Sequence, residues 1–352
     1  MSKTDDIPLN TGDREQTSDG SATAVAIAGR AWPIPWVSMR FQLREFTLIG
    51  ILILMVVVYA IAAPNFLTVF NLVNVLRQVS VTAVAAVGAT AVILVAGIDL
   101  SVSSMVALTG CLAALYLQNQ PNHGPEQALV AVLLAIVFGT GAGLFNGLAI
   151  TGLRVPPFIT TLATMTILRG VALLLTNAYP VSIPPGAYNY IGVGYIGPVP
   201  VPVLIMLLMF AIGWVILNRM TIGRRIYAIG GNERAARLSG INVSRVLLFV
   251  YAFAGFCAGV SGVIISSRLT SGQPTGSLGF ELDVIAAVVV GGTSLSGGRG
   301  KLSGSLLGAV LIAILGNGLI LMDVPEYYQR LVTGFVILLA VTADMLLRKR
   351  SV

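Results

Sequence analysis

Residues 127–150 read QALVAVLLAIVFGTGAGLFNGLAI, which is 24 residues without one charged side chain. About 20 apolar residues in an α-helix cross the hydrocarbon layer of a bilayer, so this stretch predicts a transmembrane helix. Its apolar residues are continuous and do not alternate with polar ones, which disfavours a transmembrane β-barrel.

The composition of the whole chain extends this prediction. Of its 352 residues, 56% are hydrophobic and 10% are charged, against about 25% charged in typical soluble domains. A water-soluble globular protein is excluded, because there are too few polar residues to cover its surface. The formal charge of +7 is better explained by membrane topology than by a nucleic-acid partner. His123 is the single histidine, and Cys111 and Cys257 lie in apolar runs, so we expect no metal site, no disulfide framework and no catalytic centre.

Ten apolar segments follow one another along the chain, and they predict an all-α polytopic membrane protein with about ten transmembrane helices. Their bounds are 46–63, 79–97, 102–118, 127–150, 158–176, 200–217, 245–267, 283–297, 303–321 and 331–347. The Gly-rich runs at 88–97 and 291–300 are candidates for broken or re-entrant helices. Residues 64–78 are interpreted as a helix lying along the membrane surface.

The chain divides into a polar tail at 1–45, expected to be cytoplasmic and partly disordered, and a transmembrane domain at 46–350. With the N-terminus in the cytoplasm, 17 of the 21 Lys and Arg residues fall on the cytoplasmic side. This asymmetry predicts that both termini are cytoplasmic.

A weak internal repeat predicts two parallel structural halves. The paired segments are Gly88–Thr90 with Gly291–Thr293, Leu100–Ser103 with Leu302–Ser305, and Asn146–Leu148 with Asn317–Leu319. The first helix of each copy, at 79–97 and 283–297, runs in the same direction, as parallel repeats require.

Two Gly-rich segments match nucleotide-binding motifs only in part. Gly192–Gly197 has the spacing of a dinucleotide fingerprint, but no strand precedes it. Gly298–Lys301 resembles a phosphate loop, but Leu302 stands where a magnesium-binding Ser or Thr is needed. We therefore expect that the chain binds no nucleotide or other cofactor and is not itself an enzyme.

The inner loop at 218–244 predicts a short helix of about two turns at the membrane surface. Asn232 is a good N-cap, and Glu233 favours the positive start of the helix. Gly240 can adopt the left-handed backbone conformation that ends a helix. Such a helix can present a charged face to a soluble partner, and an ordinary basic inner loop is the alternative.

Four segments, in this order, resemble ABC-type sugar importer permeases of the ribose, arabinose, xylose and galactose class. They are Gly97–Ser104, Pro157–Gly170, Tyr227–Ile241 and Gly291–Gly304. The resemblance covers residues 46–347. Ser103 departs from the pattern, because a glycine is usual at that place.

The resemblance implies the permease subunit of an ATP-driven importer in the bacterial inner membrane, which moves a pentose, a hexose or a related polyol into the cytoplasm. It implies three partners: a second copy of the chain, a periplasmic sugar-binding protein, and a cytoplasmic ATPase whose two fused nucleotide-binding domains hold ATP and Mg. It also assigns the docking of that ATPase to Gly231, Asn232, Glu233, Arg234, Ala235, Ala236, Arg237, Leu238, Ser239 and Gly240.

Candidates for the sugar pathway are Asp99, Ser101, Asn146, Arg169 and Asn317, because polar groups within a membrane are costly and often functional. Gln78 is a further amide able to hydrogen-bond sugar hydroxyls along the pathway. Structural alternatives stay open. Asp99 followed by Leu-Ser is also a good helix start. Arg169 can tie helices together through a carboxylate or backbone carbonyls, and amides also hold helices together.

An ion-coupled secondary transporter is the main alternative function. Such transporters usually carry several carboxylates in mid-membrane, whereas only Asp99 is placed inside here, at the edge of a span. An intramembrane enzyme is the second alternative, but no nucleophile–base pair or cluster of metal ligands is visible.

Overall fold

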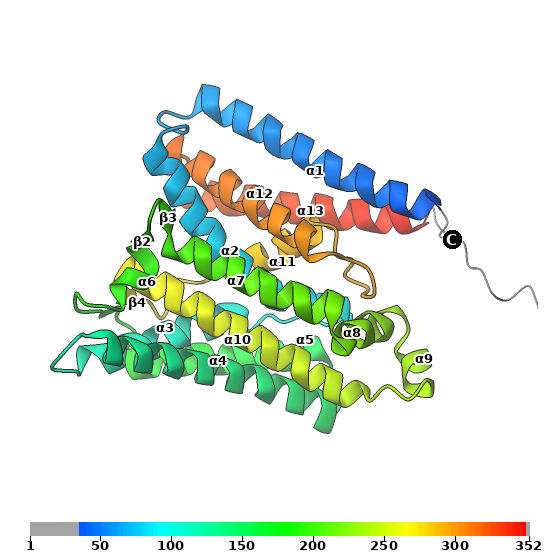
Figure 1. The fold of residues 1–352 in the computed structure, drawn as a ribbon, viewed down its shortest axis with the longest axis horizontal. Helices are drawn as coiled ribbons and strands as arrows, with labels where there is room; N and C mark the ends of the chain where they lie inside the picture. Colours follow the sequence, from blue (N-terminus) through cyan, green and yellow to red (C-terminus); the bar gives the residue numbers. More distant parts are fainter. Residues whose placement is uncertain (1–34, 350–352) are drawn as a thin grey trace, which may run out of the picture. The chain divides into compact units, whose positions relative to one another are not determined.

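The computed structural model describes residues 35–349, and the chain from Arg44 onward forms one compact unit. Helices dominate it (Figure 1). The long helices are α1 (Pro35–Ala62), α2 (Val69–Leu94), α3 (Val102–Gln118), α4 (Pro125–Gly152), α5 (Pro157–Thr176), α7 (Val201–Trp214) with its π-helical extension η1 (Val215–Arg219), α10 (Val243–Leu269), α12 (Leu302–Leu321) and α13 (Glu326–Lys349). The shorter helices are α6 (Asn189–Val193), α8 (Thr221–Gly231), α9 (Glu233–Leu238) and α11 (Phe280–Val290).

Four two-residue strands depart from the all-α expectation. β1 (Val181–Ser182) pairs antiparallel with β4 (Ser271–Gly272), and β2 (Tyr195–Ile196) pairs antiparallel with β3 (Val199–Pro200). Figure 1 places these strands and α6 at one end of the helices, which we call the α6 end, and α8 and α9 at the other, the α9 end.

Six helical segments in the described part of the chain are long and apolar enough to cross a membrane: Val69–Leu94, Pro125–Gly152, Pro157–Thr176, Val201–Arg219, Val243–Leu269 and Leu302–Leu321. Shorter apolar segments occupy Thr47–Ala62 and Val102–Gln118. A polytopic membrane protein is therefore confirmed, while ten crossings stay a prediction. Residues 1–34 of the predicted tail lie outside the described residues, and α1 already begins at Pro35.

The separate surface helix predicted at 64–78 is wrong. Residues 69–78 are instead the first turns of α2, which continues without a break to Leu94. The helix starts at Thr68, whose side-chain oxygen accepts a hydrogen bond from the Asn71 backbone N–H, and no proline follows to interrupt it. The Gly-rich run at 88–97 is accordingly helical as far as Leu94 and irregular only beyond it.

The predicted span at 283–297 is also wrong in extent. Helix α11 has 11 residues and ends at Val290, so at 1.5 Å per residue it is about half as long as a bilayer core is thick. The Gly-rich run at 291–300 is irregular, as predicted, with positive φ angles at Gly292, Gly297, Gly298 and Gly300.

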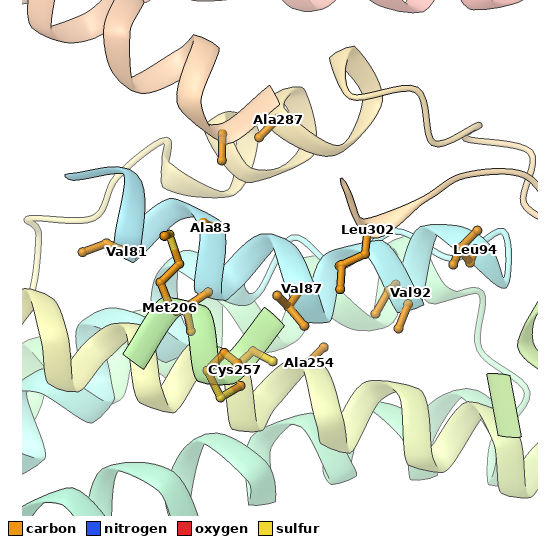
Figure 2. Close-up of a cluster of buried hydrophobic side chains, with 14 of the residues drawn as sticks. Val81, Ala83, Val87, Val92, Leu94, Met206, Ala254, Cys257, Ala287 and Leu302 are labelled. Carbon is orange, nitrogen blue, oxygen red and sulfur yellow. The ribbon is translucent and has the colours of Figure 1, made fainter. Parts of the chain in front are cut away.

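Helix α2 is the centre of the packed core. Figure 2 shows Val81, Val87 and Leu94 of α2 among side chains from α7, α10, α11 and α12. Its residues from Val79 to Leu94 are all buried. A helix that is apolar on every side is stable only when other helices surround it, which explains why α2 occupies this place.

Helices α4 and α10 approach each other through glycines. A methyl group at Gly139 would lie 2.6 Å from the Gly255 carbonyl oxygen, and one at Gly143 would lie 2.1 Å from the Tyr251 carbonyl oxygen. Stripes of small residues allow this close approach, which maximises van der Waals contact where water supplies no hydrophobic driving force. These glycines are therefore packing residues.

The predicted repeat is only partly mirrored in local structure. Leu100–Ser103 and Leu302–Ser305 each lie at the start of a helix, α3 and α12. Asn146 lies on α4, one helix after its motif, whereas Asn317 lies on the same helix as its motif. These two asparagines are therefore not at equivalent places, and the parallel repeat as a whole stays a prediction.

The glycine contact between α4 and α10 generates a stability prediction. Gly143→Ala is expected to lower the free energy of unfolding by about 1–3 kcal/mol, because the added methyl group forces the two backbones apart. Gly141→Ala on the same helix is the matched control, since nothing lies within 4 Å of its added methyl group. Thermal unfolding in detergent measures both variants, and equal midpoints for the two would contradict the packing role of Gly143.

Candidate functional site: the α9 end and the buried polar residues

Helix α9 has the N-cap and the C-terminal glycine that the sequence predicted. The Asn232 side-chain oxygen accepts a hydrogen bond from the Ala235 N–H at 2.9 Å, which satisfies one of the free donors at the helix start. Gly240 has a φ of +80° and ends the segment in the left-handed conformation. The Glu233 carboxylate and the Arg237 guanidinium form an ion pair at 2.7 Å on the exposed face.

The surface of α9 combines an apolar tip with surrounding charges. Leu238 is 84% exposed, although it is a large apolar residue. Arg234 and Arg237 are exposed on the same short helix, while Ala236 is buried and attaches the helix to the rest of the fold. An exposed apolar anchor with a polar rim is typical of a protein–protein contact.

Helix α8, which the sequence reasoning did not predict, joins α9 to two Gly-rich loops. A methyl group at Gly230 would lie 1.8 Å from the Leu94 carbonyl oxygen and 2.4 Å from the Gly298 nitrogen. The Gly298 N–H donates a hydrogen bond to that same Leu94 oxygen at 2.9 Å. The end of α2, the loop after α11 and the last turn of α8 therefore meet at one point.

Tyr227 adds a second contact between α8 and the loop after α11. Its hydroxyl donates a hydrogen bond to the Gly300 carbonyl oxygen at 3.0 Å. Burial raises the pKa of the Tyr227 phenol, so this hydroxyl keeps the proton that it donates.

The α9 end carries a concentration of exposed cations. They are Arg154, Arg219, Arg224, Arg225, Arg234, Arg237, Arg245, Arg299 and Lys301. Glu233 is the one acid within 218–244. An excess of Lys and Arg in the loops on one side is the pattern of the cytoplasmic side of a membrane protein.

Three of the predicted pathway residues form one buried cluster. The Asp99 Oδ1 atom accepts hydrogen bonds from the Ser101 N–H at 2.9 Å and from the Ser101 hydroxyl at 2.5 Å. The Asn146 amide donates to the same hydroxyl at 2.9 Å, which connects the loop between α2 and α3 to α4. All three residues are buried.

Arg169 and Asn317 lie apart from this cluster. The Arg169 guanidinium donates a hydrogen bond to the Pro274 carbonyl oxygen, and thus ties α5 to the loop between β4 and α11. The Asn317 amide on α12 forms a reciprocal pair with Asn71 on α2, with two hydrogen bonds of 2.9 Å.

Sequence reasoning named Gln78 as a pathway amide but missed Asn71 and Asn74, which lie beside Asn317. Asn71, Asn74 and Gln78 lie at i, i+3 and i+7 on one face of α2, and Arg268 of α10 donates a hydrogen bond to Asn74 at 2.8 Å. The spacing of the three amides was a usable signal, but 64–78 had been interpreted as a surface helix. Among residues 35–349, no group of three His, Cys, Asp or Glu side chains is placed to hold a metal ion.

Comparison with known proteins places this arrangement in a family. Residues 71–341 match the family described as branched-chain amino acid transport system / permease component. No solved structure gives a significant match.

The matches to three curated relatives extend over most of this chain and nearly the whole length of each relative. The chain is 46% identical over 309 residues to the ribose import permease protein of Haemophilus influenzae, which is 87% of this chain and 94% of that protein. It is 44% identical over 326 residues to the ribose import permease protein of Escherichia coli strain K12, covering 92% and 98% of the two chains. The D-allose transport system permease protein of the same strain is 37% identical over 301 residues, covering 85% and 91%.

These matches exclude an ion-coupled transporter as the function of the chain. They agree with the permease motifs and with the six helices among residues 35–349 that are long and apolar enough to cross a membrane. The chain belongs to the permease components of binding-protein-dependent ABC importers and is a monosaccharide permease of the ribose, allose and xylose class.

Proposed function

We propose that two copies of this chain form the pathway through the bacterial inner membrane for a pentose, a hexose or a related polyol. An ATPase with two fused nucleotide-binding domains, which holds ATP and Mg, binds at the cytoplasmic α9 end, and a periplasmic sugar-binding protein binds at the α6 end. The cation concentration at the α9 end supports this orientation. Both termini are then cytoplasmic, and α13 ends toward the α9 end in Figure 1.

The observation that carries the coupling proposal is α9 itself. The segment from Gly231 to Gly240 is capped at both ends, so its shape does not depend on the partner. Leu238 is its apolar anchor, and Arg234 and Arg237 form the charged rim. Such a helix fits a groove on the ATPase in the manner of other helix-in-groove contacts.

Gly230 transmits the movement of α9 into the membrane. Because Gly230 contacts both the end of α2 and the loop after α11 without any intervening side chain, a displacement of α8 must move those backbones as well. ATP binding draws two α9 helices together and opens the pathway outward, and hydrolysis resets it inward. The coupling arises because the ATPase holds α9 differently in its two states.

The predicted pathway residues receive different roles under this proposal. The mutual hydrogen bonds of Asp99, Ser101 and Asn146 favour the alternative in which they hold the α2–α3 loop in place. The contact from Arg169 to the Pro274 carbonyl likewise favours the helix-tying role. Asn317 is also paired, with Asn71, but it lines an open pocket and therefore remains our candidate for contact with the sugar.

Energy coupling is tested with the complete importer in proteoliposomes. Uptake of radiolabelled D-ribose is expected only when ATP reaches the ATPase and the binding protein is present on the opposite side. Proton or sodium gradients imposed without ATP are expected to drive none. Uphill uptake by this chain alone, with no nucleotide hydrolysed, would refute the proposal.

Leu238→Asp tests the docking role of α9. The carboxylate would be desolvated in an apolar groove, so co-purification of the ATPase is expected to fall by about tenfold or more. Because the side chain is 84% exposed, the thermal midpoint of the permease alone is expected to stay unchanged. Leu153→Asp, at another exposed site of the α9 end, is the control and is expected to retain the ATPase. If both variants retain the ATPase equally, docking at α9 is contradicted.

Gly230→Ala tests the transmission step. The added methyl group has no space beside the Leu94 oxygen, so we expect ATPase binding to persist while sugar uptake per ATP hydrolysed falls by about tenfold. Gly152→Ala at the end of α4 is the matched control, because nothing lies within 4 Å of that methyl group. Unchanged uptake per ATP in a stably folded Gly230→Ala variant would disprove this role.

A further inference from the structure

At the α6 end, three helix faces and the turn before α2 line an open pocket of about 610 Å³. Helix α2 contributes Asn71, Asn74 and Gln78, helix α10 contributes Arg268, and helix α12 contributes Asn317. We call these five residues the amide pocket. A volume of this size is within the usual range for a small-molecule site.

The polar groups of the amide pocket are paired with one another across helices. Asn71 pairs with Asn317, and Arg268 donates a hydrogen bond to Asn74. Gln78 is half-buried, and its side-chain amide has no hydrogen-bond partner among the described residues. Polar side chains in a membrane helix are costly unless they pair, are hydrated or serve a ligand, and the Gln78 amide lines the open pocket, where it is available to water or to a ligand.

The chemistry of the lining selects the class of ligand. Planar amides offer a donor and an acceptor side by side, which matches the neighbouring hydroxyl groups of a sugar. Phe70 is 85% exposed and lines the same cavity, so an aromatic ring is available for the C–H face of a sugar ring. The lining contains one cation and no carboxylate, and it therefore offers no counter-ion for the ammonium group of an amino acid.

We propose that the amide pocket is the site at which the permease itself binds the monosaccharide that the binding protein releases. The inference rests on the proposed direction of transport, in which the α6 end faces the binding protein. Gln78 contacts a sugar hydroxyl directly, and the sugar displaces one or both of the paired contacts made by Asn74 and Asn317. Specificity for neutral, polyhydroxylated ligands then resides partly in this chain.

Cysteine protection tests occupancy of the pocket. Cys111 and Cys257 are buried, so Gln78→Cys introduces one accessible thiol into each copy of this chain, and labelling is read from the permease band of the complete importer in nanodiscs. D-ribose in large excess is expected to slow its alkylation by a hydrophilic maleimide by roughly threefold or more, and L-leucine is expected to have no effect. Gln118→Cys, at the exposed end of α3 outside the pocket, is the control and is expected to react at the same rate with or without ribose.

Transport provides an independent measurement. Gln78→Leu is expected to lower ATP-dependent D-ribose uptake roughly three- to tenfold at limiting sugar, because one hydroxyl contact is lost. Gln118→Leu is expected to leave uptake unchanged, and both variants are expected to keep the thermal midpoint of the unmodified chain.

The possible results distinguish failure of the pocket proposal from failure of the proposed importer function. If the unmodified chain imports ribose but Gln78→Cys reacts at one rate with and without ribose, or fails to react with maleimide at all, the pocket proposal is wrong while the importer function stands. Normal uptake by Gln78→Leu would also overturn it. If the unmodified importer moves no ribose, both experiments use the pentose or hexose that it does import, and absence of protection by that sugar overturns the pocket proposal. If it imports no pentose, hexose or polyol, the proposed function fails.

Discussion

Backbone-to-backbone contact between helices is the constraint on which the rest of this structure depends. Helix α10 lies against α4 where glycines face glycines, and a methyl group at Gly88 of α2 would lie 2.7 Å from the Ala254 Cα atom of α10. Within a membrane such contacts replace the hydrophobic driving force that water supplies elsewhere. They place α10 between α2 and α4, and the polar residues of α2, α4 and α10 take their positions from that arrangement.

The same kind of contact recurs at Gly230, where we propose that movement passes from α9 into the membrane helices. Gly230 brings α8 against the end of α2 and the loop after α11 as closely as Gly143 brings α4 against α10. Where backbones touch directly, there are no side chains between them that could change rotamer and absorb a displacement, and packed interiors transmit strain. Glycine therefore serves two purposes in this fold: it closes the core, and it links the surface helix α9 to the membrane helices.

Local features were predictable from the sequence, and features that depend on distant segments were not. The caps of α9 lie within ten residues of each other, so Asn232 and Gly240 were sufficient to predict that helix. The continuity of α2 was missed because Asn71, Asn74 and Gln78 are polar, and polarity on its own indicates a surface. The sequence indicated Asn317 and Gln78 separately but not the amide pocket, because its residues come from distant segments: Asn71 and Asn317 are 246 positions apart, and no local pattern brings them together.

Helix α2 has one further consequence. It is one unbroken helix of 26 residues, about 39 Å long, whose first turns hold Asn71 and Asn74 and whose last residue contacts Gly230. Because α2 is one stiff helix with contacts at both ends, a tilt of one end displaces the other end as well. If a ligand bound near the first turns of α2 changes the affinity for a partner at its last turn, thermodynamic linkage requires that the partner changes the affinity for the ligand by the same factor.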